Sequence, residues 1–310
     1  MTDFRRQLSF HRPELLRHCY RMLGSFADAE DLVQDTLLRA WNARDTYAGN
    51  APVSHWLMRI ATNACLNELA SRRRRGLPQL DEVAAVELVH VEEQAGLEWV
   101  TPAPDAQLFP EPTQAVETRE SVALAFLALL QRLSARQRAV FLLKDVLNWS
   151  VTEIASALEM SEAAVSSALH RARETVSSPK AMPAADPSTE ALQSYVRSWE
   201  LHDVDALLTL MRDDIVFSMP PFPTWFRGRT NVERFLRGPQ FRARWSAGFR
   251  TRLTRANGLI GLAFYRSHEG EYHASSLQVI RFTDNLAAEI VCFIGPECLR
   301  GFELPERLTR

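Results

Sequence analysis

The sequence predicts a multidomain protein in which two all-α modules precede one α+β domain. Three observations predict this organisation. Apolar residues recur at helical spacing through residues 1–75 and again through 118–178. Strand-like runs follow only in the last module, after residue 187. A proline-containing segment at 76–117, with 9 acidic residues and no Lys or Arg, separates the two helical modules. The length of 310 residues suits two or three domains.

Charge is divided along the chain. Residues 1–75 carry 12 basic and 8 acidic residues, and the acidic segment begins directly after Arg75, which indicates modules with separate electrostatic tasks. The longest apolar stretch, Val122–Leu130, is too short to span a bilayer, and the N-terminus has no apolar signal core. We therefore expect a cytoplasmic protein without membrane contact. The 4 cysteines lack zinc-site spacing, so we expect free thiols, no metal and no cofactor.

The first module contains three helical signals. They cover Pro13–Leu23, a second helix that opens on a capping box at Ser25 and runs to about Trp41, and Ser54–Arg73. The second helix presents acidic and amide side chains opposite its apolar stripe. The loop at 46–53 places aromatic and amide groups beside an arginine-bearing helix, a pattern suited to holding an unstacked base.

The stretches DAEDLVQDTLLRAW (Asp28–Trp41) and HWLMRIATNACLNELASRRRR (His55–Arg75) resemble region 2 of extracytoplasmic-function sigma factors of the sigma-70 family. The resemblance covers about the whole first module. It implies that the acidic face binds the clamp helices of RNA polymerase β′ through Glu30, Asp31, Gln34 and Asp35. It implies that the −10 promoter element is melted and read by Tyr47, Asn50, Trp56, Arg59, Asn63, Asn67, Arg72 and Arg73. Taken alone, the acidic face also fits a solvated surface, the arginine run a generic phosphate contact, and Trp56 core packing.

The second module, residues 118–178, has the pattern of a helix-turn-helix. Helices are predicted at 118–130, from Ser134 to about 145, from Ser150 to 158, and from 162 to 177, with capping-box starts at both serines. On the last helix, exposed small polar side chains suit base edges and arginines suit phosphates.

Leu133–Val176 resembles sigma region 4, which reads the −35 element and docks on the β flap of the polymerase. The resemblance implies −35 contacts by Ser161, Ala163, Ser166, Ser167, His170, Arg171 and Arg173. Many members of that family carry Lys and Arg where this chain has Ser166 and Ala168, so recognition would depend more on Arg171, Arg173 and the polymerase. In the same family the segment that joins the two regions threads the polymerase channel later used by RNA. An acidic linker suits its basic walls, and a solvated tether is the alternative.

A second linker at 179–188 leads to the third module, residues 189–310. It begins with helices at 189–199 and 204–211. A helix at 231–236 then interrupts strand-like runs at 215–219, 247–253, 259–267, 272–282 and 287–293. Helices followed by hairpin-connected strands predict an α+β domain with a curved antiparallel sheet.

Three stretches of this module, Trp199–Asp203, Asp213–Phe217 and Met219–Gly228, resemble the SnoaL-like (nuclear-transport-factor-2-like) domain. That fold is a cone with an apolar pocket, and a subset of extracytoplasmic-function sigma factors carries it as a C-terminal extension that tunes sigma activity. The resemblance implies a pocket lined by Trp199, Met219, Trp225, Phe226, Trp245, Phe264 and His273, residues that also fit a core. General-base candidates for an enzyme of this fold are His202, Asp203, Asp214, Tyr265 and His273.

The sequence therefore predicts an alternative sigma factor, and not an enzyme. It would bind core RNA polymerase and promoter DNA and be modulated by contact between its own SnoaL-like domain and its sigma regions. The alternative is an isomerase- or cyclase-type enzyme fused to a DNA-binding segment, because fold analogy does not exclude an activity. A helix-turn-helix regulator that acts without polymerase is disfavoured, because such regulators usually need a dimerisation element. A small ligand and the oligomeric state remain open.

Overall fold

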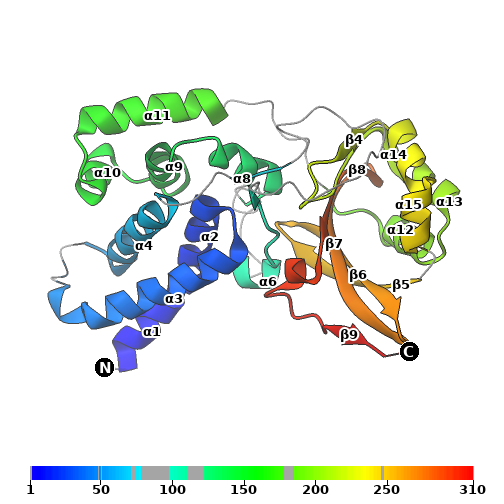
Figure 1. Cartoon of the computed structure of the whole chain (residues 1–310). Coiled ribbons are helices and arrows are strands. Elements are labelled where there is room, and N and C mark those ends of the chain that lie inside the picture. The colour runs from blue at the N-terminus through cyan, green and yellow to red at the C-terminus, as the bar shows by residue number, and fades with distance from the viewer. Residues whose placement is uncertain are drawn as a thin grey trace. The chain divides into compact units, whose positions relative to one another are not determined.

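The computed structural model describes residues 2–47, 49, 51–70, 75–77, 98–110, 122–176, 185–245 and 248–309. The chain divides into two compact units (Figure 1). The first combines Met1–Gly76 with Ala106–Lys180, and the second combines Leu77–Asp105 with Ala181–Arg310. Both helical modules therefore belong to one unit, and Leu77–Asp105 of the acidic segment belongs to the same unit as the α+β domain.

The first module is a helical bundle. Its elements are α1 (Thr2–Phe10), α2 (Arg12–Leu23), α3 (Phe26–Asn42), η1 (Arg44–Thr46) and α4 (Val53–Leu69). The three predicted helices are confirmed as α2, α3 and α4, whereas α1 was not predicted. The Ser25 hydroxyl accepts a hydrogen bond from the Asp28 backbone N–H at 3.4 Å and caps α3. Gly24 ends α2 in the left-handed region, at φ 70°, which glycine adopts without strain.

The last arginine of the basic run folds back onto this bundle. Arg75, in the short strand β1 (Arg75–Gly76), donates to the Leu23 carbonyl at 2.7 Å and pairs with Asp28 at 2.8 Å. Its side chain is 11% exposed. Arg75 therefore stabilises the turn between α2 and α3.

The short helix α6 (Asp105–Leu108) lies in the acidic segment. The second module contains α8 (Leu124–Gln131), α9 (Ala135–Phe141), a π-helical turn η2 (Leu142–Val146), α10 (Val151–Leu158) and α11 (Glu162–Val176). Both predicted capping boxes are present, Ser134 with Gln137 and Ser150 with Glu153. The turn after α10 passes through Glu159 at φ 53°. α10 and α11 therefore form the predicted helix-turn-helix pair.

Within the first unit the two helical modules pack on each other, α4 against α9 and α10, and α2 against α8 and α9. Arg138 of α9, 4% exposed, donates to the Met22 carbonyl at the C-terminal end of α2, where a helix favours a cation. The ring of His55 at the start of α4 stacks on Trp149 at 4.4 Å between centroids and an interplanar angle of 18°. The His55 Nδ1 lies 3.4 Å from the Glu153 carboxylate.

The second unit is an α+β domain, as predicted. Its helices are α12 (Thr189–Glu200), α13 (Val204–Thr209), α14 (Arg229–Leu236), α15 (Pro239–Trp245) and the 3₁₀ turn η3 (Pro296–Leu299). Its strands are β2 (Glu98–Trp99), β3 (Met211–Ser218), β4 (Trp225–Arg227), β5 (Phe249–Ala256), β6 (Leu259–His268), β7 (Glu271–Thr283), β8 (Leu286–Ile294) and β9 (Arg307–Leu308).

The main sheet has the order β4-β3-β8-β7-β6-β5, with β9 on β7. One pairing corrects the prediction of an antiparallel sheet: β3 and β8 are parallel, with Phe217 opposite Ile290. Helices α14 and α15 and four strands separate them in the chain, so β8 returns beside β3 in the same direction. Such a crossover, unlike a hairpin, permits parallel pairing.

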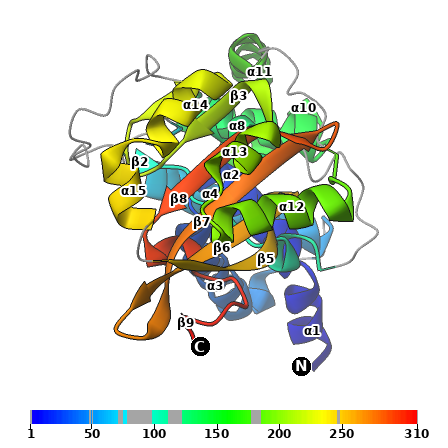
Figure 2. The same cartoon turned by 90° about the vertical axis from the view of Figure 1, so that its right-hand side faces the viewer.

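The helices α12 to α15 gather on one face of this sheet (Figures 1 and 2). Strand alternation sends Leu262 and Phe264 of β6 into the core that the helices cover. Tyr265 is buried on the opposite side, because successive residues of a strand point to opposite faces.

Candidate polymerase and nucleic-acid interfaces

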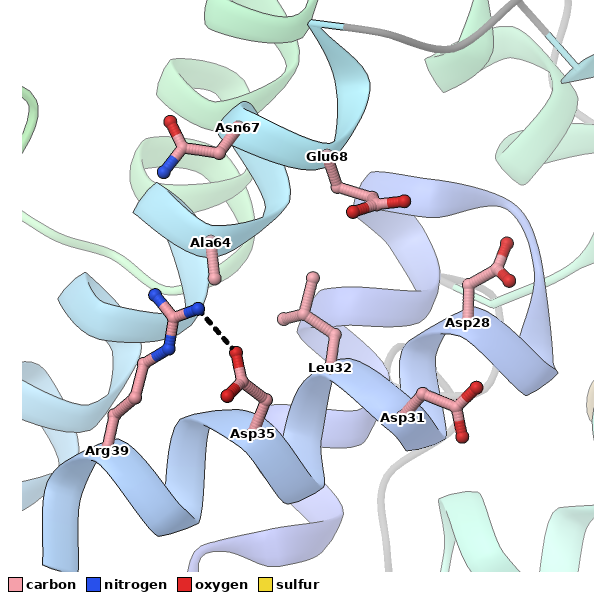
Figure 3. A pocket seen from close by; sticks show the side chains of 8 residues that line it. All are labelled: Asp28, Asp31, Leu32, Asp35, Arg39, Ala64, Asn67 and Glu68. Atoms are coloured by element: carbon pink, nitrogen blue, oxygen red, sulfur yellow. Dashed lines mark ion pairs between the residues drawn. The ribbon is translucent and has the colours of Figure 1, made fainter. Parts of the chain in front are cut away.

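A polar groove of about 350 Å³ lies between α3 and α4 (Figure 3). Its lining residues are Asp28, Asp31, Leu32, Asp35, Arg39, Ala64, Asn67 and Glu68. Four carboxylates and one arginine line the groove; Arg39 pairs with Asp35 at 2.7 Å, and Asp28 pairs with Arg75 at 2.8 Å. An acidic groove attracts a basic protein surface by electrostatic complementarity.

The four predicted polymerase contacts divide between this groove and its surroundings. Asp31 and Asp35 line the groove. Gln34 is exposed on the same helix, and Glu30 is half-buried and pairs with Arg12 at 3.2 Å. Leu38, 60% exposed on α3, adds an apolar contact surface that the sequence analysis did not select.

The predicted −10 residues that the structure describes lie on α4 and the loop before it. The rings of Tyr47 and Trp56 are 5.1 Å apart, and the Tyr47 hydroxyl donates to the Ala51 carbonyl. Both rings are half-buried, so each keeps an accessible surface on which a base can stack.

A polar stripe continues along the same helix. Arg59, Asn63 and Asn67 are exposed and four residues apart, which places them on one helix face. Asn67 also lines the acidic groove, so the stripe and the groove are contiguous. Asn50, Arg72 and Arg73 lie outside the described residues.

The helix α11 exposes most of its predicted −35 residues. Those on its solvent side are Ser161, Ala163, Ser166, Ser167, His170 and Arg171. The Ser161 hydroxyl accepts from the Ala164 backbone N–H at 3.2 Å, which caps the helix.

Two details change the expectation for the charge of this surface. Ala168 is buried, so the contrast with the basic residues of the family concerns phosphate contact only at Ser166. Arg173 forms two hydrogen bonds with Asp145, at 2.9 and 2.6 Å, and these bonds raise its pKa. Arg173 therefore joins α11 to η2, and Arg171 is the arginine whose position on the exposed face suits a phosphate.

The predicted pocket residues of the α+β domain lie mostly in its core. Trp199, Met219, Phe226, Trp245 and Phe264 belong to one buried cluster. Trp199 and Trp245 lie 5.2 Å apart, and the Trp245 indole N–H donates to the Trp199 carbonyl at 3.2 Å.

The last two predicted pocket residues lie elsewhere. Trp225 is buried beneath Arg227, whose guanidinium lies 5.6 Å from the indole centroid. His273 is near the β6–β7 turn, 3.6 Å from Glu271.

A separate surface pocket of about 550 Å³ lies at the turn between α12 and α13. Trp245 is on its wall together with two general-base candidates, His202 and Asp203. Burial lowers the pKa of His202. The Asp203 carboxylate accepts from the Ala206 backbone N–H at 2.9 Å, so this side chain caps α13.

The remaining base candidates lie outside this pocket. A hydrogen bond from Arg212 lowers the pKa of Asp214, the reverse of what a base near neutral pH requires. Burial raises the pKa of Tyr265. Within the described ranges, no cluster of His, Cys and carboxylate side chains is arranged to hold a metal ion, and no helix is long and apolar enough to cross a membrane.

Comparison with known proteins agrees with these modules. Residues 9–75 match the family Sigma-70 region 2, and residues 123–176 match Sigma-70, region 4. The chain is 38% identical over 316 residues to the ECF RNA polymerase sigma factor SigG of Mycobacterium tuberculosis, an alignment that covers 99% of this chain and 85% of SigG. It is 28% identical over 236 residues to SigJ of the same organism, covering 73% of this chain and 70% of SigJ.

The fold has a counterpart over its full length. The crystal structure of the Mycobacterium tuberculosis extracytoplasmic function sigma factor SigJ superimposes with a TM-score of 0.61 at 22% identity, covering 98% of this chain and 99% of that one. A two-region sigma architecture followed by an α+β domain thus defines the class of protein. The chain belongs to the extracytoplasmic-function RNA polymerase sigma factors, and an α+β domain follows its two sigma regions.

Proposed function

We propose that the chain binds core RNA polymerase through the acidic groove of region 2 and acts in the cytoplasm without catalysis of its own. The groove supports this because Asp31, Asp35 and Glu68 converge there with a single arginine. Leu38 beside them supplies apolar area, so the surface combines electrostatic steering with burial. Most side chains expected to line a cone pocket pack against one another in the core, which supports a role without catalysis for the C-terminal domain, although Trp245 also borders a surface pocket.

Promoter recognition is proposed for two surfaces. The Tyr47–Trp56 pair accepts an unstacked base of the −10 element, and Arg59 and Asn63 contact the adjacent strand. On α11, Ser166, Ser167 and Arg171 contact the −35 element. Asn50, Arg72 and Arg73 remain −10 candidates by resemblance alone.

Regulation by the C-terminal domain is supported by a docked piece of the linker. Ala103 donates to the Asn257 side-chain oxygen at 3.0 Å and accepts from the Asn257 backbone N–H at 3.1 Å. The Gly258 backbone N–H donates to Asp105 at 2.8 Å. Asn257 and Gly258 form the β5–β6 turn, with φ of 55° and 78°, which suits an Asn-Gly hairpin. Because Asn257 is 1% exposed, its bonds to the linker are shielded from water.

This contact is the single observation that carries the regulatory proposal. The C-terminal domain binds part of the linker between the two sigma regions. A change in that domain that breaks these hydrogen bonds would free more linker residues to contact the polymerase. Neither Ala103 nor Asp105 was singled out by the sequence analysis. The Asn-Gly turn signal at 257–258 was available there, but it predicts a hairpin and not its partner.

In vitro transcription with core polymerase tests both proposals. The full-length protein is expected to give promoter-dependent transcripts from its own upstream region. Asn257→Ala removes the acceptor for the Ala103 N–H, at a cost of about 1–3 kcal/mol for a buried unpaired donor, and should change transcript yield several-fold. Asn231→Ala is the matched control, because the Asn231 side chain is half-buried and donates a local hydrogen bond to the Arg227 carbonyl, at the start of its own helix.

The outcomes separate the two proposals. Absence of transcript and of core binding from the full-length protein would contradict the sigma function. Equal transcript from Asn257→Ala and from the full-length protein would contradict regulation through the linker, and the direction of any change gives its sign.

A further inference from the structure

Arg255, at the end of β5, contacts both chain segments that bound sigma region 4. Its guanidinium lies 3.5 Å from the carboxylate of Asp105, in the first linker. It also lies 3.0 Å from Asp186, near the end of the second linker, with two further hydrogen bonds to that carboxylate at 3.1 and 3.2 Å. In the sequence, region 4 (residues 118–178) lies between these two aspartates.

Each of the two segments has additional anchors on the same domain. The first is fixed by the bonds of Ala103 and Asp105 to the β5–β6 turn. The second is fixed where the Ala185 backbone N–H donates to the Phe282 carbonyl at 3.2 Å and the Ser188 backbone N–H donates to Asn285 Oδ1 at 2.7 Å. Arg255 is the residue that the two anchored segments share.

Burial differs across this three-residue cluster. The Asp105 side chain is 12% exposed, Arg255 is 36% exposed, and Asp186 is 63% exposed. An ion pair shielded from water is screened less by salt than one on the surface. Salt therefore screens the Arg255–Asp186 pair more strongly than the Arg255–Asp105 pair.

We propose that Arg255 acts as a clasp, by which we mean that its side chain holds both linkers of region 4 on the β5–β6 turn. The two linkers, here called the tethers, are residues 103–105 and 185–188, and loss of the Arg255 contacts releases them together. The role of the clasp in transcription rests on the proposed function, whereas the contacts of Arg255 that define the clasp do not. Freeing residues 103–105 lengthens the first tether by about 10 Å, and freeing residues 185–188 lengthens the second by about 13 Å. When the clasp is open, the chain segments on both sides of region 4 are longer, so region 4 can move farther from the C-terminal domain.

Hydrogen exchange of the full-length protein without polymerase tests the clasp. In Arg255→Gln, the backbone amides of Ala103, Asp105, Ala185 and Ser188 are expected to exchange at least about tenfold faster, while β7 stays protected. Arg250→Gln is the matched control, since Arg250 lies on the same strand and its guanidinium stacks over Tyr272 at 5.3 Å. Acceleration at one tether alone, or at neither, would overturn the proposal.

A second variant tests the proposal in case Arg255→Gln does not fold. If Arg255→Gln loses protection in β7, the double variant Asp105→Asn with Asp186→Asn, which keeps the arginine, must give the same joint acceleration. Unchanged exchange in that double variant would likewise overturn the clasp.

Adding core polymerase distinguishes the clasp from the sigma function. Both tethers of the unmodified protein are expected to exchange faster in a complex that makes promoter-dependent transcripts. Protection that persists in such an active complex overturns release by polymerase and leaves the sigma function intact. A protein that makes no transcript fails as a sigma factor, whatever its exchange pattern shows about the clasp.

Discussion

Replacing His55 by alanine is expected to open the packing between sigma regions 2 and 4. The imidazole stacks on Trp149 at 4.4 Å, and its Nδ1 lies 3.4 Å from Glu153. An aromatic pair of this kind contributes about 0.5–1.5 kcal/mol beyond its buried area. The ion pair contributes at most about 1 kcal/mol, because the two side chains are 31% and 47% exposed. The variant therefore loses about 1–2 kcal/mol of the contact, which favours the open state by about 5–30-fold.

The opening matters because the two regions read separate promoter elements. Elements centred at −35 and −10 are about 25 base pairs apart, or about 85 Å along the duplex at 3.4 Å per base pair. Regions packed directly on each other do not reach both elements, so the packed state has to open. The apparent dissociation constant equals the intrinsic constant divided by the fraction of competent protein, so it falls as that fraction rises.

We therefore expect His55→Ala to bind core polymerase about 5–30-fold more tightly, measured by anisotropy of a labelled full-length protein. His55→Phe keeps the stacking and loses the ion pair, so its effect should be smaller. His170→Ala is the control, because His170 lies on the exposed face of α11 beside Glu174. Equal affinities for His55→Ala and the unmodified protein would refute the inference that this contact holds the two regions together.

Three further predictions address other parts of the molecule. Tyr47→Ala or Trp56→Ala should lower open-complex formation on a duplex promoter by about 5–150-fold, while core binding is retained. This factor corresponds to the loss of one base stack of about 1–3 kcal/mol. Permanganate footprinting measures open complexes, and an equal effect on a pre-melted template would contradict a role in melting. Asp31→Asn with Asp35→Asn should weaken core binding and flatten its dependence on salt concentration, whereas an unchanged salt slope would mean that the groove does not face the polymerase. Burial, followed by the nearby Arg21, lowers the pKa of His18 from 6.5 to about 3. The unfolded chain therefore takes up a proton that the folded bundle excludes, and the free energy of unfolding falls by up to about 1.4 kcal/mol per pH unit as the pH drops from about 6 to 4. Urea unfolding should show this slope and its loss in His18→Gln; an identical slope in the variant would assign it to other groups.

Local structure was predictable because its signals lie within a few residues of one another. Ser134 and Ser150 each predict a helix start because Gln or Glu follows three residues later, and both capping boxes are present. The periodicity of apolar residues likewise identified α2, α3 and α4, together with the α+β character of the last module. The exposed positions of α11 followed from the same helical period, which separates Ser166 from the buried Val165.

The partners of charged and aromatic side chains were decided by the tertiary structure. Arg173 looked like a phosphate ligand until Asp145, 28 residues earlier, was found beside it. His55 and Trp149 are almost a hundred residues apart in the chain, and only the packing of α4 on α10 brings them into contact.

The sequence by itself determined the modules, their order and the sigma-factor family, because helix periods, capping boxes and family motifs are properties of contiguous residues. The tertiary structure decided which module holds which segment. Arg255 contacts both Asp105 and Asp186 although 80 residues lie between these two aspartates, and the Asn257 side chain accepts a hydrogen bond from Ala103. Such contacts depend on how distant parts of the chain approach one another, and no pattern within a short stretch of sequence specifies that approach.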